Sequence, residues 1–112
     1  MLVILGNNLK NSMDMHLILE QRKITSIVCQ SPVNLINNLR ENHAILLVID
    51  EITPFIRKVA IILHQLQYQK NIICWVSNTD FIKSISDVFG EYNLNNIEFV
   101  TNLLEMPNAN LR

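Results

Sequence analysis

The stretch that decides the fold is ILLVIDEITP, residues 45–54. Five aliphatic side chains precede Asp50, and Pro54 follows four residues after it. A short, wholly apolar run of this kind is typical of a strand buried on both faces, as in parallel sheets. Open α/β sheets place their sites beyond the carboxyl ends of the strands. We therefore expect Asp50 at the mouth of a sheet, where the groups around it decide what it can do.

The rest of the chain alternates between strand-like and helix-like segments. Apolar runs predict further strands at residues 2–5, 24–29, 72–76 and 97–101. Helices are predicted between them at 9–22, from Ser31–Pro32 to about Asn42, at 55–66 and at about 79–92. This α/β alternation indicates a parallel five-stranded sheet with helices on both faces. A flavodoxin-like order of 2-1-3-4-5 is the usual solution at this size, and we expect it here.

The apolar positions of each predicted helix indicate which face turns inward. For the first helix these are Leu9, Met13, Leu17 and Ile18, and for the second they are Val33, Ile36 and Leu39. The third and fourth helices carry longer stripes: Phe55, Ile56, Val59, Ile62, Leu63 and Leu66, then Phe81, Ile82, Ile85, Val88, Phe89 and Tyr92. We expect all four sets to pack against the sheet.

Composition excludes several classes of function. The 112 residues are 49% apolar, enough for one compact domain, and the net charge of −1 opposes binding to phosphate backbones. With only two glycines the chain has no glycine-rich phosphate loop, and no cofactor is expected. Cys29 and Cys74 lie inside apolar runs, so we expect buried thiols and neither a disulfide nor a metal site. No signal peptide or membrane span is evident, which makes the cytoplasm the expected location.

The layout of strands and motifs resembles a response-regulator receiver domain over residues 1–102. Receivers carry a phosphoacceptor Asp at the end of strand three with Pro four residues later, as Asp50 and Pro54 stand here. They carry Ser or Thr after strand four, where this chain has Ser77, and an aromatic residue in strand five, where it has Phe99.

Other receiver positions are not matched. The paired acids that hold Mg²⁺ are replaced by Asn7 and Asn8, and Asn102 stands where the family has Lys. No amphipathic fifth helix can be built from residues 103–112, so a short or missing fifth helix is expected. The resemblance is therefore to a degenerate receiver, or pseudo-receiver.

The chemistry of these positions agrees with that interpretation. Phosphorylation of a carboxylate needs a cation to neutralise developing charge, and Mg²⁺ prefers anionic oxygens. Asn7 and Asn8 offer neutral amide oxygens only, and Glu51 should point away from Asp50 if strand alternation persists. We expect no Mg²⁺-dependent phosphorylation at Asp50, and no metal site.

Simpler roles exist for the same residues. Asp50 can be a strand-end carboxylate that caps the following loop or helix, and Ser77 can hydrogen-bond a loop backbone group. His16, His43 and His64 have no ligand-like spacing and are expected on the solvated surface. A triad of Ser77, His64 and Asp50 lacks the glycines of a nucleophile elbow.

The resemblance implies a regulatory interaction module at the N-terminus of a bacterial transcription regulator of the LuxR/FixJ type. Residues 103–112 would then be a linker or a truncated C-terminal segment, and DNA would be bound only through a downstream domain absent from this chain. The partner would be a second copy or a partner regulator protein. In that family the face formed by helix four and strand five commonly serves as the surface that binds the partner. Here that face corresponds to Ile82, Ile85, Phe89, Tyr92 and Phe99. Without a fifth helix, Phe99 and its neighbours are expected to lose their cover.

Two other functions remain open. Asp50 could be a true phosphoacceptor with an unconventional metal arrangement. Alternatively, the chain could be a localisation module, as in the atypical receivers that precede a pilus-assembly ATPase of the TadZ type. An enzyme is the least favoured reading, because no acid–base pair or cofactor loop can be placed.

Overall fold

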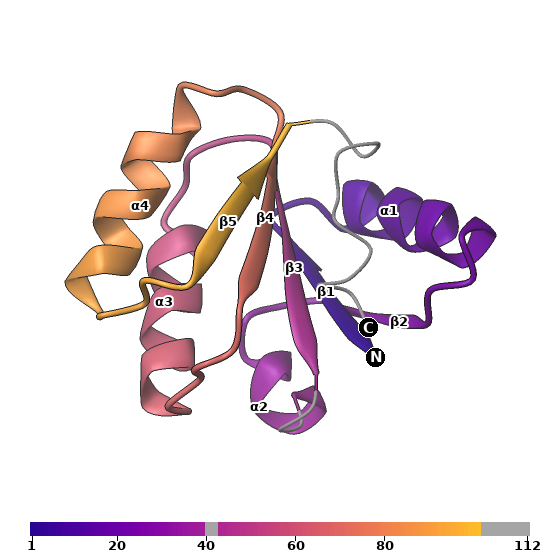
Figure 1. Ribbon diagram of the computed structural model, residues 1–112, viewed down its shortest axis with the longest axis horizontal. Helices are drawn as coiled ribbons and strands as arrows, with labels where there is room; N and C mark the ends of the chain where they lie inside the picture. The colour runs from indigo at the N-terminus through magenta and orange to yellow at the C-terminus, as the bar shows by residue number, and fades with distance from the viewer. Residues whose placement is uncertain (40–42, 102–112) are drawn as a thin grey trace.

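The computed structural model describes residues 1–39 and 43–101. Within these ranges the chain alternates strictly between strands and helices (Figure 1). The elements are β1 Leu2–Gly6, α1 Leu9–Gln21, β2 Ser26–Cys29, α2 Asn34–Asn38, β3 Ala44–Ile49, α3 Phe55–Gln65, β4 Ile72–Val76, α4 Phe81–Glu91 and β5 Ile97–Val100. The interpretation of residues 103–112 as a linker, and the short or missing fifth helix, concern residues outside these ranges.

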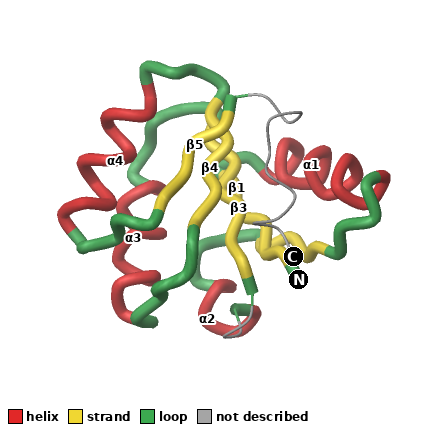
Figure 2. The backbone as a smooth tube through the Cα atoms, in the orientation of Figure 1, coloured by secondary structure: helices red, strands yellow, loops and turns green. Residues whose placement is uncertain are grey.

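The strands form a single sheet in the order β2-β1-β3-β4-β5, and every neighbouring pair is parallel. This confirms the flavodoxin-like α/β fold that the alternation predicts. β3 lies in the centre, where Val48 is in register with Gly6 of β1 and with Trp75 of β4. Figure 2 shows the strands as one twisted layer between the helices. All five carboxyl ends therefore lie along one edge of the sheet.

The helices divide unequally between the two faces of the sheet. One face packs against α2, α3 and α4 in a core that includes Leu35, Val59 and Phe89. On the other face, α1 is the one helix among the described residues that packs against the sheet, through Met15 and Leu19. Figure 1 shows α1 on one side of the sheet, well apart from α3 and α4. Because both faces are covered, β1 and β3 are buried almost throughout, which explains why their sequences are uninterrupted apolar runs.

The predicted inward face of α1 is wrong. Leu9, Met13 and Leu17 are exposed, and the helix buries Ser12, Met15 and Leu19 instead. The cause lies at Gly6, where an added Cβ would stand 2.5 Å from Ser12 Oγ. The helix therefore lies so close to the end of β1 that only a small side chain fits between them, and this contact sets the rotation of the whole helix.

The second helix is also shorter and differently rotated than predicted. It spans Asn34–Asn38, and its buried residue is Leu35, whereas Val33 and Ile36 are exposed. Ahead of it the backbone turns through i to i+3 hydrogen bonds, such as Leu35 N donating to Pro32 O at 3.1 Å. This tighter winding advances each residue further around the axis than an α-helix does, so the face expected from 3.6 residues per turn is not the one buried.

The faces of α3 and α4 match the prediction more closely. Ile56, Val59 and Leu63 of α3 are buried, as are Ile85 and Phe89 of α4, although Leu66 just beyond α3 is exposed. Among the described residues, no helix is long and apolar enough to cross a membrane.

Candidate functional site

Asp50 lies immediately beyond the end of the central strand, as the sequence predicts. The segments that follow β1 and β4 flank it, because Gly6 pairs with Val48 and Val76 pairs with Ile49. Asn7 and Ser77, the next residues along those two segments, are thereby placed beside Asp50. This is the position at which α/β sheets carry their sites, so the edge of the sheet around Asp50 is the first candidate.

The carboxylate of Asp50 is held by a side chain that the sequence reasoning did not select. Asn11 Nδ2 donates a hydrogen bond to Asp50 Oδ2 at 2.7 Å. Asn11 lies on the first turn of α1, three residues after the helix cap, and is partly buried. The signal that could have found it is its position: the first turn of the helix after strand one faces the same sheet edge as Asp50.

Asn7 and Asn8 take separate structural roles and do not form a paired ligand set. The Asn7 side chain binds backbone: its Nδ2 donates to Glu51 O at 2.8 Å, and its Oδ1 accepts from Asp50 N at 3.4 Å. Asn8 is the N-cap of α1, with Oδ1 accepting from Lys10 N at 2.9 Å. Each amide oxygen accepts from a backbone N–H group of a different segment, Lys10 in α1 for Asn8 and Asp50 for Asn7.

Ser77 contacts the backbone of Asp50 and not its carboxylate. Its Oγ donates to Asp50 O at 3.3 Å, while its N–H donates to Ile49 O at 3.1 Å. The simpler role, a hydroxyl bound to a backbone group, is therefore the one that the structure shows. Asn102, the remaining receiver-site equivalent, lies outside the described residues.

The second oxygen of Asp50 is unusual. Oδ1 is buried and has no hydrogen-bond partner in the described part of the chain, and the same holds for Thr53 Oγ1 three residues later. An unpaired buried carboxylate oxygen is costly, since the desolvation of the charge is not compensated. The site is thus a carboxylate held on one side by a neutral amide, with no cation supplied by the neighbours described above.

The donor set does not fit Mg²⁺. Across the described residues, no group of three or more His, Cys, Asp or Glu side chains is arranged to hold a metal ion. Around Asp50 the nearest side-chain donors are the amides of Asn7 and Asn11 and the Ser77 hydroxyl. Mg²⁺ prefers carboxylate oxygens, whereas the amides beside Asp50 are neutral and already bind other groups.

A cavity of about 260 Å³ opens beside Asp50, between α1 and the ends of β3 and β4. Its walls are largely apolar. The lining residues are Asn11, Asp14, Met15, Ile18, Val48, Asp50, Trp75 and Ser77. Trp75 is partly buried against the α1-side core, so it reports on this region of the molecule.

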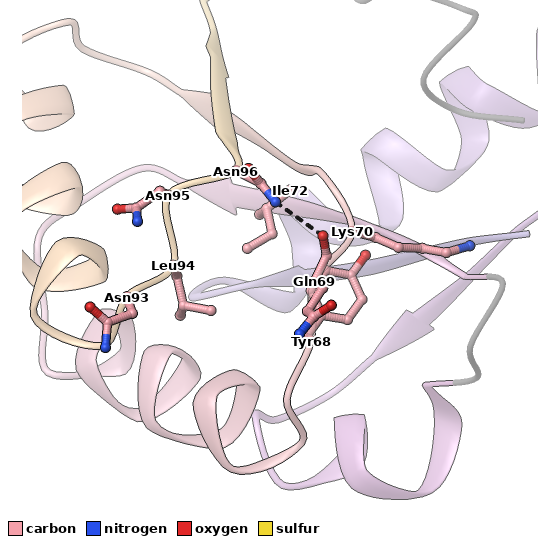
Figure 3. A pocket seen from close by; sticks show the side chains of 8 residues that line it. All are labelled: Tyr68, Gln69, Lys70, Ile72, Asn93, Leu94, Asn95 and Asn96. Carbon is pink, nitrogen blue, oxygen red and sulfur yellow. Dashed lines mark hydrogen bonds between the residues drawn. The ribbon is translucent and has the colours of Figure 1, made fainter.

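A second cavity, of about 230 Å³, lies at the opposite edge of the sheet, where β4 and β5 begin (Figure 3). Figure 3 shows the Asn96 side chain directed toward Gln69, whose carbonyl oxygen accepts from Asn96 Nδ2 at 3.0 Å. Tyr68 donates from its hydroxyl to His43 O at 3.1 Å, and burial raises the pKa of this phenol to about 12. The cavity is lined mainly by amides, with one lysine and the hydrogen-bonded phenol of Tyr68, where the loops that lead into β4 and β5 meet.

The three histidines are hydrogen-bonded at separate places and share no site; His64 is exposed, whereas His16 and His43 are half-buried, in contrast to the expected solvated surface. His16 Nδ1 lies 2.6 Å from Ser26 Oγ, and His43 Nδ1 lies 3.2 Å from Asn38 O. His64 Nδ1 lies 3.0 Å from Tyr92 O, at the end of α3 that faces away from Asp50, so no triad with Ser77 and Asp50 forms.

The expected interaction face on α4 and β5 is wrong in part. Ile85 and Phe89 are fully buried, so they cannot contact a partner. Ile82, Tyr92 and Phe99 are partly buried and pack against the core on the α3 and α4 side. Phe99 therefore points away from the face that a fifth helix would cover, because strand alternation turns Val100 to that face and Phe99 to the other.

No protein-family model matches this chain, and comparisons with curated proteins and with solved structures return no match.

Proposed function

We propose that this chain is a phosphorylation-independent, receiver-like interaction module of a bacterial transcription regulator, acting in the cytoplasm. The observation that carries the proposal is the 2.7 Å hydrogen bond from Asn11 Nδ2 to Asp50 Oδ2. A phosphoacceptor carboxylate needs a cation beside it to neutralise the developing charge. Here a neutral amide is bound to one of the two carboxylate oxygens.

The neighbours of Asp50 support the same conclusion. Asn8, which stands at one of the two acidic positions, is used as the N-cap of α1. Ser77, which stands at the hydroxyl position, is bound to the Asp50 backbone. A fold with a preserved architecture and a disabled reaction centre is suited to binding other proteins, since the rigid α/β frame remains available as a surface.

The first experiment exposes the protein to acetyl phosphate or beryllofluoride with Mg²⁺ and follows its mass and amide resonances. The expected result is no Mg²⁺-dependent adduct. A stoichiometric adduct that disappears in Asp50→Ala would overturn the proposal and establish the alternative, a true phosphoacceptor. We also expect Asp50→Asn to leave regulatory activity largely intact.

The second experiment titrates Mg²⁺ and follows Trp75 fluorescence, because this indole lines the cavity beside Asp50. The wild type should give no saturable change. The matched variant carries Asn7→Asp and Asn8→Asp, which restore the two carboxylates, and Asp is as good an N-cap as Asn. That variant should show saturable binding, and saturation in the wild type would contradict the proposed loss of the metal site.

A further inference from the structure

Helix α1 carries an apolar stripe on its outer surface. Leu9, Met13 and Leu17 are 48%, 43% and 52% exposed, and they follow one another at intervals of four residues. At 100° per residue these positions fall within about 80° of the helix circumference, so they form one continuous ridge. The helix already buries Met15 and Leu19 against the sheet, which means that α1 is apolar on two sides. Exposed apolar groups are ordinary when scattered, but a contiguous ridge marks a contact surface.

The ridge has the symmetry of a contact between two copies of the same helix. Read in either direction from Met13, the next ridge residue is a leucine four positions away. Two such helices that pack antiparallel about a two-fold axis at Met13 place Leu9 of one copy beside the partner's Leu17, and the reverse. A two-fold contact requires a self-complementary patch of this kind.

The charges beside the ridge are complementary in the same arrangement. Lys10 and Asp14 are both exposed and lie on the same flank of α1, one turn apart. When the two-fold axis passes at Met13, Lys10 lies about 4.5 Å from that axis, measured along the helix. The partner's Asp14 lies about 1.5 Å from the two-fold axis in the same direction, so the two charges come close together. Two symmetric ion pairs then border the ridge. Within one chain, among the described residues, neither group takes part in an ion pair.

We propose that a second copy of this chain docks antiparallel along α1, with Met13 at the two-fold axis. This proposal identifies the partner and the contact surface of the interaction module proposed above. It rests on that proposed function only in assuming that the chain acts by binding another protein. A single helix pair buries less than the roughly 800 Å² per partner of a standard interface, so the dimer is weak and depends on protein concentration.

Cross-linking provides the sharpest test, because Cys29 and Cys74 are buried and do not compete. Under mild oxidation, Met13→Cys should form a disulfide dimer, since this position meets its own copy at the axis. Leu9→Cys should cross-link when mixed with Leu17→Cys and to a much lower extent by itself. Leu66→Cys, on an exposed apolar residue beyond α3, is the matched control and should stay monomeric. Equal cross-linking at positions 13 and 66 would overturn the proposal.

Sedimentation equilibrium on the full chain gives the second readout. The wild type should show a concentration-dependent monomer–dimer equilibrium. The dissociation constant of the dimer should rise at least tenfold in Met13→Glu and stay unchanged in Leu66→Glu. Lys10→Asp and Asp14→Lys should each weaken the dimer, and their combination should restore it. A wild type that stays monomeric at high concentration, or a dimer indifferent to Met13→Glu, would refute the α1 contact. Neither result bears on the Mg²⁺ and phosphodonor experiments, so the two proposals fail separately.

Discussion

The two glycines of this chain should respond to alanine in opposite directions. An added Cβ at Gly6 would lie 2.5 Å from Ser12 Oγ and 2.9 Å from the backbone oxygen of Val48. The serine hydroxyl can rotate away, but Val48 belongs to the central strand and is paired with β1 and β4. The helix or the strand must therefore move. Forced overpacking of this kind costs about 1–3 kcal/mol, and we expect Gly6→Ala to lower the free energy of unfolding by that amount.

Gly90 is the matched control. It lies in the last turn of α4, is exposed, and would bring its new Cβ within 4 Å of nothing. Glycine inside a helix is less favourable than alanine by about 0.5–1 kcal/mol, because its unfolded chain has more freedom to lose. Gly90→Ala should accordingly raise the free energy of unfolding by about that amount.

Urea denaturation followed by circular dichroism and Trp75 fluorescence measures both variants. In thermal scans the expected shifts are a decrease of roughly 5–15 °C for Gly6→Ala and an increase of roughly 2–6 °C for Gly90→Ala. The two sites share no contact, so the double variant should equal the sum within about 0.5 kcal/mol. If Gly6→Ala were as stable as the wild type, α1 would not lie against the end of β1 as described.

Two further predictions concern buried titratable groups. Burial raises the pKa of both thiols, most strongly that of Cys74. We therefore expect Ellman's reagent to label Cys29 and Cys74 rapidly in denaturant, but in the native protein only at the rate at which the fold opens. Fast labelling of the native protein would contradict their burial. Burial also raises the pKa of Tyr68 from 10.0 to about 12, so the unfolded chain loses this proton first, and stability present below pH 10 should decline as the pH rises toward 12. In Tyr68→Phe this decline should be smaller. Urea denaturation at several pH values measures it, and a free energy of unfolding that falls with pH as steeply in Tyr68→Phe as in the wild type would exclude the phenol as its source.

The strands and their order could be predicted because their signal is local and redundant. A strand with both faces covered must be apolar at successive positions, as residues 2–5 and 45–49 are. The alternation with helices then leaves few topologies, because parallel crossovers share one hand. The buried faces of α3 and α4 could also be predicted, since each helix has one apolar stripe and that stripe packs on the sheet.

Only part of the candidate site could be predicted from the sequence. The position of Asp50 follows from its place after the central strand, whereas its partner Asn11 depends on where α1 begins and how it is rotated. The role of Asn8 as the cap of α1 was likewise not predicted. Both outcomes are set by the packing of α1, which no periodicity in that helix reveals, because α1 has apolar groups on two sides.

The rotation of α1 links the fold to the proposed function. Gly6 lets the helix approach the sheet so closely that Ser12, and not a larger apolar residue, faces it. With Ser12 inward, Met15 and Leu19 complete the buried side, and the ridge of Leu9, Met13 and Leu17 must face outward. The same rotation brings Asn11 to Asp50. One close contact between a glycine and a serine therefore accounts both for the hydrogen bond on the carboxylate at the end of β3 and for the exposure of the apolar ridge, which we propose to be the dimer contact. A helix rotated to bury its most apolar stripe would have neither feature.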